Sequence, residues 1–426
     1  MEHCIGQCET VSRSKDPASV PSAASASTRS TVLGTDFLRN PHLMGQLLAV
    51  EQPILAVRLP SGVQGRLVTR GEHCRAALSH PRLVRDPERT TWSLGATAGI
   101  LGSPSDGHTT RLLVSHMLHA DPDRHVGLRA LVAEAFNVPN APELPERIER
   151  IAEATLDTIP TPPATPGIDL LAEFARPFSL AVTGALLGLD HMACRELVQW
   201  TRVIVASRSG AALVHAGAQA WASVDRLIAD RHVQPGPDLV SGLVHASVHG
   251  DRLSRDEIVT AVLLLVVASH DIAVGLIGTL TQAMLNEHGR PSADGPDAPP
   301  ARLADRLQHL IQFDGSYPVA DFRFVAAPVE IGGTVLQEDE LLIISRLTGA
   351  DAVTSAGRPQ SGDTGAPGDA LHRHLGIGLA RLQARIGVEM LFTRHPAVTP
   401  AVEPDHLRWS DDPVRPGLTS LPVLLP

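Results

Sequence analysis

The sequence is poor in several residue types, and each scarcity limits what the protein can be. Lys15 is the only lysine, so nearly all positive charge is arginine, and aromatic residues make up 3% of the chain, so aliphatic side chains must fill the core. The formal net charge of −10 argues against a nucleic-acid partner, because such proteins usually carry a basic patch. With abundant Ala, Gly and Pro, the preference for arginine indicates a bacterial gene of high GC content.

Cysteine occurs at only four positions, which are Cys4, Cys8, Cys74 and Cys194. These positions have neither the paired spacing of a zinc site nor the density of a disulfide framework, so we expect free thiols in a reducing cytoplasm. The N-terminus lacks a charged start followed by an apolar stretch, which argues against a signal peptide. The most apolar run, 258–268, is too short to span a bilayer. We therefore predict a soluble, cytoplasmic protein without a membrane segment.

The chain divides into a tail and one large domain. Residues 1–33 are rich in Ser, Ala, Thr and Pro, and they hold too few large apolar groups to offset the entropy of ordering, so we predict a disordered tail. Residues 34–426 are predicted to form a single domain that is mainly α with a minor β portion. No internal repeat is present.

The periodicity of apolar residues predicts most of the elements of this domain. Ser254 and Glu257 have the spacing of a capping box, which predicts a helix over 256–286 that is apolar on nearly every side and must lie in the middle of the protein. Other helices are expected over 36–50, 71–79, 145–159, 168–189, 238–249, 302–313 and 376–392. Strands are expected within 53–70, as a hairpin, and over 323–326, 329–336 and 341–345, with short strands near Leu407 and Leu421.

Four segments resemble those of bacterial cytochrome P450 proteins. Asp121-Pro-Asp-Arg-His-Val-Gly-Leu-Arg129 resembles the D-P-x-x-H-x-x-x-R start of a helix, and 251–257 resembles the beginning of the family's long central helix. Phe322-Arg-Phe-Val-Ala326 with 329–333 resembles a strand pair, and 374–385 resembles the helix after the haem-ligand loop. The resemblance covers about 36–426 and implies a triangular helical domain with a small β-rich region. It also implies that His125, Arg129, Arg323 and His372 stand at positions that hold haem propionates.

The residues that carry the family's oxygen chemistry depart from its pattern. The axial cysteine of the F-G-x-G-x-H-x-C loop falls on His374, in Pro367-Gly-Asp-Ala-Leu-His-Arg-His374, and a thiolate is the ligand that favours O–O cleavage. In place of A-G-x-[DE]-T the central helix reads Ala268-Ser-His-Asp-Ile272, which keeps the acid as Asp271 but has Ser269 for the glycine and Ile272 for the threonine hydroxyl. The family's E-x-x-R pair falls on His309 and Gln312.

From these departures we predict a haem-free pseudoenzyme with no catalytic residues, no metal site and no cofactor. It most resembles the auxiliary proteins that bind, stabilise and allosterically activate a deoxysugar glycosyltransferase in macrolide or anthracycline antibiotic biosynthesis. In this view the four propionate positions, the ligand position His374 and the oxygen-activation positions are all vestigial. The oxygen-activation positions are Ser269, Asp271 and Ile272. The predicted partner is a glycosyltransferase, with neither nucleic acid nor membrane.

Three alternatives remain open. The first is a haem protein with His374 as the axial ligand, acting as an oxidoreductase or a sensor, since histidine is a competent haem ligand. The second is a recruitment module for a peptide-synthetase assembly line. The third is a haem-independent enzyme, such as a cyclase, that uses the old substrate pocket. His372 and His374 could also face one metal ion, but two ligands without a third are weak support for a metal site.

Overall fold

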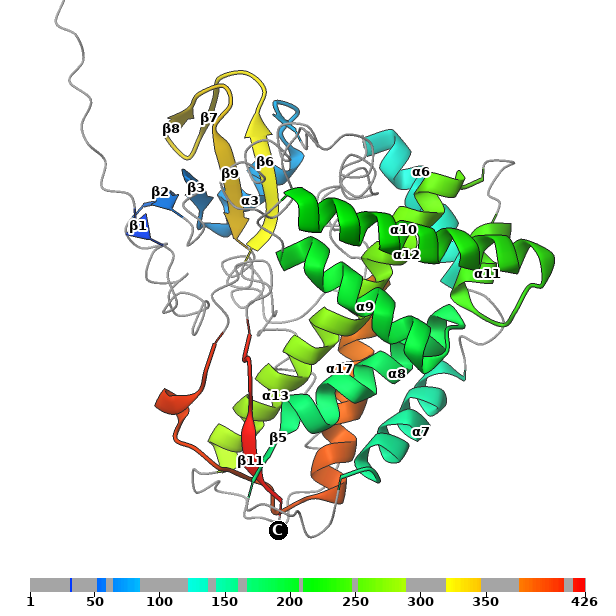
Figure 1. Cartoon of the computed structure of the whole chain (residues 1–426). Helices are drawn as coiled ribbons and strands as arrows, with labels where there is room; N and C mark the ends of the chain where they lie inside the picture. The colour runs from blue at the N-terminus through cyan, green and yellow to red at the C-terminus, as the bar shows by residue number, and fades with distance from the viewer. Residues whose placement is uncertain are drawn as a thin grey trace, which may run out of the picture.

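The fold is that of a computed structural model, which describes residues 31–32, 52–58, 64–84, 122–136, 143–159, 167–206, 210–246, 252–288, 319–345, 375–409 and 417–425. Within these ranges the protein is mainly helical with a smaller β portion, as predicted from the sequence. Figure 1 shows the larger sheet and its hairpin at one corner of a broad body of helices. Of the predicted tail, 1–30 lies outside the described residues, and Thr31–Val32 forms strand β1.

The β-rich corner is a six-stranded sheet with the order β1-β2-β3-β9-β6-β4. Its other strands are β2 (Ile54–Arg58), β3 (Gln64–Val68), β4 (Leu83–Val84), β6 (Val319–Val325) and β9 (Leu341–Ser345). β2 and β3 pair antiparallel, as the predicted hairpin requires, and β3 joins β9 in parallel register from Arg66↔Leu342 to Val68↔Ile344. Helix α3 (Gly71–Ser79) lies against this sheet, and β7 (Val329–Ile331) and β8 (Thr334–Leu336) form the separate hairpin.

One long helix runs through the helical body in three parts. They are α12 (Arg255–Val266), a π-helical segment η4 (Val267–Ile272) and α13 (Ala273–His288). The predicted capping box is present, because the Ser254 side chain accepts a hydrogen bond from the Glu257 backbone N–H and the Glu257 carboxylate accepts one from Ser254 N at 2.8 Å. The span Arg255–Asn286 is long and apolar enough to cross a membrane, but 71% of its most apolar window is buried inside the protein.

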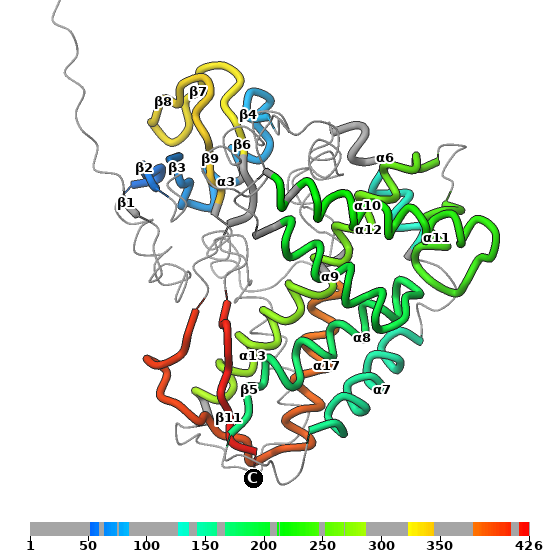
Figure 2. Tube along the Cα trace, viewed as in Figure 1, coloured from blue at the N-terminus to red at the C-terminus, as the bar shows by residue number. Residues whose placement is uncertain are grey.

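In the described part of the chain, eight further helical segments make up the rest of the helical body (Figure 2). They are α6 (Pro122–Phe136), α7 (Leu144–Leu156), the π-helical turn η3 (Leu171–Ala175), α8 (Arg176–Leu187), α9 (His191–Ala206), α10 (Gly210–Val233), α11 (Leu239–His245) and α17 (Leu375–Arg394). α9 and α10 cover one side of the central helix and had no counterpart among the predicted elements. α17 packs along α13 and η4, and it also contacts α7.

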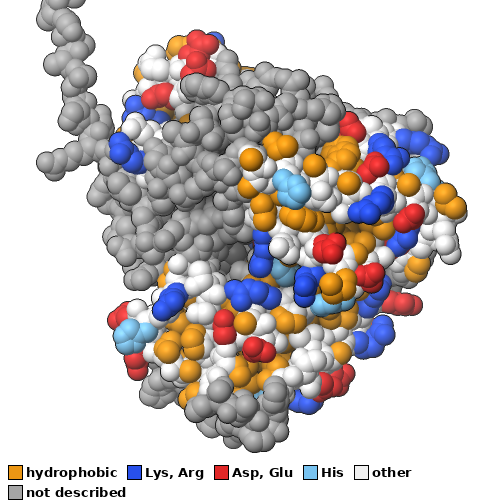
Figure 3. Space-filling view, viewed as in Figure 1, with side chains coloured by type: hydrophobic (Ala, Val, Ile, Leu, Met, Phe, Trp, Pro, Cys, Tyr) orange, Lys and Arg blue, Asp and Glu red, His pale blue; other side chains and the backbone are white. Residues whose placement is uncertain are grey.

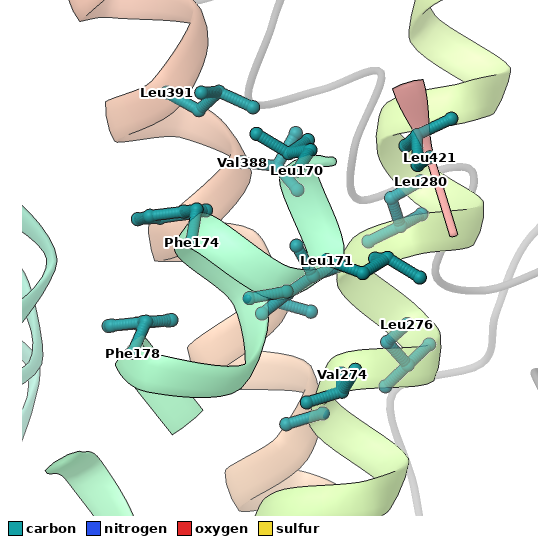
Figure 4. Packing of buried hydrophobic residues seen from close by; sticks show 14 of the residues in the cluster. Leu170, Leu171, Phe174, Phe178, Val274, Leu276, Leu280, Val388, Leu391 and Leu421 are labelled. Carbon is teal, nitrogen blue, oxygen red and sulfur yellow. The ribbon is translucent and has the colours of Figure 1, made fainter. Parts of the chain in front are cut away.

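The largest core cluster joins η3, α8, α13 and α17, and Figure 4 shows its side chains meeting between these elements. Phe174 and Phe178 are fully buried and stacked, with ring centroids 5.4 Å apart. α17 approaches them closely at Gly387, where a Cβ atom would lie 2.8 Å from Phe178 Cε1. Glycine is therefore needed there by packing, although glycine weakens a helix interior.

The C-terminal chain closes the opposite end of the molecule with a three-stranded sheet of order β10-β11-β5. Its strands are β10 (Thr399–Pro400), β11 (Pro422–Leu424) and β5 (Ile168–Asp169), and a short 3-10 turn, η5 (Pro404–His406), lies between β10 and β11. The predicted helix over 168–189 therefore begins later than expected. Ile168 and Asp169 pair instead with Val423 and Pro422, a partner that lies far along the chain.

Candidate functional site

The middle of the central helix carries the polar residues that the sequence singled out, and there it becomes π-helical. η4 contains Ser269, Asp271 and Ile272, so all three predicted oxygen-activation positions lie on one turn. π-helical turns inside α-helices are frequent at functional sites because they displace side chains from the regular helical path. The Ser269 hydroxyl is buried and lies 2.9 Å from the Thr183 hydroxyl of α8, so the two share a hydrogen bond.

Asp271 is paired with a cation from a neighbouring helix. Its Oδ1 accepts a hydrogen bond from Nε of Arg202 on α9 at 3.1 Å, and the two side chains are 6% and 41% exposed. A buried carboxylate is costly unless it is paired, and Arg202 supplies that pairing. The ion pair also ties α9 to the central helix. The acid that the sequence retains at this position is therefore engaged by a residue of another helix.

His270 is the most strongly perturbed titratable group of the segment. The residue is 3% exposed, and burial lowers the pKa of its imidazole from 6.5 to about 4. The Asp271 carboxylate acts in the opposite direction, and Arg202 and Arg176 add to the lowering. The pKa falls because burial disfavours the charged imidazolium more than the neighbouring Asp271 carboxylate favours it. His270 is therefore neutral near pH 7.

A fourth helix joins this polar cluster from the other side. Gln383 of α17 is fully buried, and its side-chain amide donates to the Ser269 backbone carbonyl at 3.0 Å. Three buried side-chain atoms of this cluster have no hydrogen-bond partner in the described part of the chain: His270 Nδ1, Asp271 Oδ2 and Gln383 Oε1. Buried polar atoms are rarely left unsatisfied, so water or a bound molecule is expected to supply partners for them.

The structure describes the predicted haem-pocket positions unevenly. Arg323 lies on β6 and is 4% exposed, and Arg129 lies half-buried on α6. His125 lies in the first half of α6, where only the backbone is described. His372 and His374 lie outside the described residues, as do His309 and Gln312. The described chain contains no group of three or more His, Cys, Asp or Glu side chains that could hold a metal ion.

Three residues of the cluster were not predicted from the sequence: Thr183, Arg202 and Gln383. Arg202 had a usable signal, because it is a long polar side chain directly before the apolar run 203–206, whereas Gln383 is flanked by Arg381 and Arg385 and had none. A long polar residue on a buried helix face needs a polar partner from another element. Which partner it meets depends on the packing of α8, α9 and α17 around η4.

No family model matches the chain, but curated proteins and solved structures do. Cytochrome P450 107B1 from Saccharopolyspora erythraea is 31% identical over 382 residues, covering 88% of this chain and 92% of the relative. The cytochrome P450 monooxygenase PikC from Streptomyces venezuelae is 30% identical over 402 residues, covering 92% of both chains. The solved structure of the bacillaene polyketide synthase cytochrome P450 PksS from Bacillus subtilis matches with a TM-score of 0.75 at 27% identity, over 92% of this chain and 98% of that one.

These similarities confirm the predicted fold and contradict two other predictions. We predicted that the chain is not an enzyme and carries no haem. Its homologues are cytochrome P450 monooxygenases of antibiotic and polyketide biosynthesis, and they depend on haem. Both predictions are therefore wrong. The error came from treating the loss of the thiolate position as the loss of all haem binding and of all activity.

The predicted haem ligand is a nitrogen donor. No cysteine follows Cys194, which is itself buried on α9, and the residue that we predicted at the ligand position, His374, lies outside the described residues. Arg323 is buried on β6, and a guanidinium is the kind of group that binds a carboxylate such as a propionate. A haem held at the predicted position would therefore have an imidazole ligand and no thiolate ligand.

Proposed function

Because the chain belongs to the cytochrome P450 family, we propose that it acts in antibiotic biosynthesis as the partner of a deoxysugar glycosyltransferase, which it binds, stabilises and activates. The observation that carries this proposal is the combination of an intact family fold with His374 and Ile272 where the family has a thiolate and a hydroxyl. A binding role uses the surface of the fold and does not depend on those two positions.

The described cluster around η4 supports a scaffold role. Asp271, the acid of the segment, is engaged by Arg202, and the Ser269 hydroxyl is engaged by Thr183. These contacts join α8 and α9 to the central helix, and Gln383 joins α17 to it as well. Polar networks that are buried in this way favour one arrangement of the helices that share them.

The physical basis of activation would be linkage. A protein that binds only the folded, competent form of a transferase raises the population of that form. When the free concentration of the binding protein is about 100 times the dissociation constant, the folded transferase is stabilised by about 2.7 kcal/mol. The transferase would then show a higher melting temperature and a longer active lifetime in the complex. No change in the chemistry of sugar transfer is required.

The test is co-expression of the chain with a deoxysugar glycosyltransferase encoded beside it. We expect a complex that survives size-exclusion chromatography, and sugar transfer that rises at least tenfold over the transferase alone. PikC serves as the matched control, because it shares the fold and the aligned length. The proposal fails if the chain neither binds nor activates the transferase, or if PikC activates it equally well. We expect both partners in the bacterial cytoplasm.

A second candidate function is oxidation of a polyketide-type substrate, which the monooxygenase relatives favour. His374 would hold the haem iron, and His125, Arg129, Arg323 and His372 would meet the propionates. Bound haem would supply redox chemistry and binding of oxygen. Asp271 and Ser269 would bind water or a substrate hydroxyl, because Asp271 Oδ2 is available for a hydrogen bond.

The absorption spectrum of the protein, purified from cells supplied with a haem precursor, tests this second function. Stoichiometric haem that is lost in His374→Ala and kept in His372→Ala would assign the ligand. A Soret band unchanged by His374→Ala, or a colourless product, would refute histidine ligation at this position. Binding to the glycosyltransferase is measured separately, so the two candidate functions can fail independently.

A further inference from the structure

A pocket of about 490 Å³ lies away from the central helix, where α7, the end of α8 and the connection between α10 and α11 meet. These elements lie together at one side of the helical body in Figure 1. The lining residues that matter are Arg147, Gly188, Arg231, Gln234, Gly236 and Asp238. On the face drawn in Figure 3, arginine side chains are interspersed with acidic and apolar ones, so a pocket lined by two arginines is a local feature.

One partly buried ion pair, between Arg231 and Asp238, fixes the wall of the pocket. Arg231 Nε donates to Asp238 Oδ2 at 2.7 Å, and its Nη2 donates to the Gly188 carbonyl at 2.8 Å. The other oxygen of Asp238 accepts from Ser241 N at 2.8 Å, which caps α11. Gly188 has a φ of 68°, and a Cβ there would lie 2.6 Å from Asp238 Oδ2. The glycine therefore permits the close approach that builds this wall.

The pocket lining has more positive charge and more hydrogen-bond donors than its own residues neutralise or bind. Asp238 neutralises only one of the two guanidinium groups that line the pocket. The half-buried side chain of Arg147 makes no hydrogen bond or ion pair with another residue in the described part of the chain. Arg231 has N–H groups that its bonds to Asp238 and Gly188 do not use. The Gln234 side chain adds a further polar group to the lining.

A pocket with an excess of guanidinium donors recognises oxyanions. Arginine presents its N–H groups as a planar fork that binds phosphate or carboxylate through two hydrogen bonds at once. The volume lies within the range of about 300–1,000 Å³ that is usual for small-molecule sites, and it exceeds what a single inorganic anion fills. Phosphate is the better match of the two groups, because it offers oxygen atoms to two guanidinium groups that approach from different helices.

We propose that this pocket binds a phosphorylated small molecule through Arg147 of α7 and Arg231 of α10. Its lining residues include none of the η4 cluster and none of the predicted haem-pocket positions. Occupancy would link α7 to the α10–α11 connection, so the ligand is expected to stabilise the fold as well as to bind it.

Isothermal titration calorimetry of the full chain tests the proposal with three probes: pyrophosphate, inorganic phosphate and citrate. We expect saturable binding of pyrophosphate, weaker binding of phosphate, and weakening of both with added salt, since the contacts are between charges. Arg147→Gln is expected to weaken pyrophosphate binding at least tenfold. Arg150→Gln is the matched control, because Arg150 is exposed on the same helix and does not line the pocket.

The outcomes separate clearly. Tight pyrophosphate binding that Arg147→Gln weakens and Arg150→Gln leaves unchanged supports the site. Equal losses in the two variants, or no saturable binding by the wild-type chain, overturn it. Citrate binding more tightly than pyrophosphate at this same arginine overturns the assignment to a phosphorylated ligand. Far-ultraviolet circular dichroism of Arg147→Gln confirms that the variant is folded before its binding is compared.

Discussion

Replacing Arg202 by alanine should destabilise the protein through the carboxylate it leaves behind. The side chain of Asp271 is 6% exposed, and its ion pair with Arg202 is 3.1 Å long. In Arg202→Ala, Asp271 Oδ1 would lose its hydrogen bond from Arg202, and Oδ2 has no partner within the described chain. The carboxylate must then stay buried without a cation, take up a proton or draw in water.

The size of the effect follows from how the two groups are exposed. Removing one partner of a fully buried pair costs about 3–5 kcal/mol, whereas an exposed pair is worth up to about 1 kcal/mol. Arg202 is 41% exposed, so solvent already screens part of the interaction, and an intermediate loss of about 2 kcal/mol is expected. With a urea dependence of about 3 kcal/mol per molar for a chain of this size, the unfolding midpoint should fall by about 0.7 M.

Urea unfolding followed by circular dichroism measures this shift. Arg195→Ala is the control, since Arg195 is exposed on the same helix, and it should move the midpoint little. In an Asp271→Asn background, Arg202→Ala should cost less than it does in the wild type, because no carboxylate remains to be stranded. A shift for Arg202→Ala no larger than that of Arg195→Ala would refute the reasoning.

Three other predictions test the fold and the cluster. Gly387→Ala places a Cβ 2.8 Å from Phe178 Cε1 and should lower the free energy of unfolding by about 1–3 kcal/mol, measured by thermal unfolding. The control Gly378→Ala has open space around its Cβ and should stabilise the same helix. Equal effects of the two substitutions would contradict the close approach at Gly387. Ser254→Ala removes the capping box of the central helix and should cost about 1 kcal/mol of unfolding free energy, and no change would show that the cap is dispensable. Because the pKa of His270 is lowered to about 4 in the folded protein, the unfolded state binds one more proton than the folded state between pH 4 and 6.5. The stability that neutral His270 contributes should therefore be fully present above pH 6.5, and the free energy of unfolding should fall by about 1.4 kcal/mol per pH unit towards pH 4. His270→Gln should flatten this dependence, and an unchanged slope would assign it to other groups.

Much of the fold could be predicted from the sequence because the signals are local. The capping box at Ser254 and Glu257 and the apolar run after it specify where the central helix starts and that it is buried. The turn at Gly332 and Gly333 specifies the β7–β8 hairpin, since both glycines adopt positive φ. The strand at Ile168 and Asp169 could not be predicted, because its partner β11 lies at the other end of the chain.

The candidate site was predicted in part. Ser269, Asp271 and Ile272 were singled out because 268–272 resembles the family's A-G-x-[DE]-T motif, and the structure places them together on η4. The partners Thr183, Arg202 and Gln383 come from three other helices, and no sequence spacing relates them to η4. The pocket beside Arg147 was missed for the same reason.

The sequence alone determined the fold family, the position of the central helix and the absence of any cysteine after Cys194. Each of these depends on residue identity or on short-range order. Only the tertiary structure decided that Asp271 meets Arg202, that His270 is buried deeply enough to lose its charge, and that Arg147 and Arg231 share one pocket. Such properties depend on which faces of separate helices pack together, and that packing is settled by the whole chain.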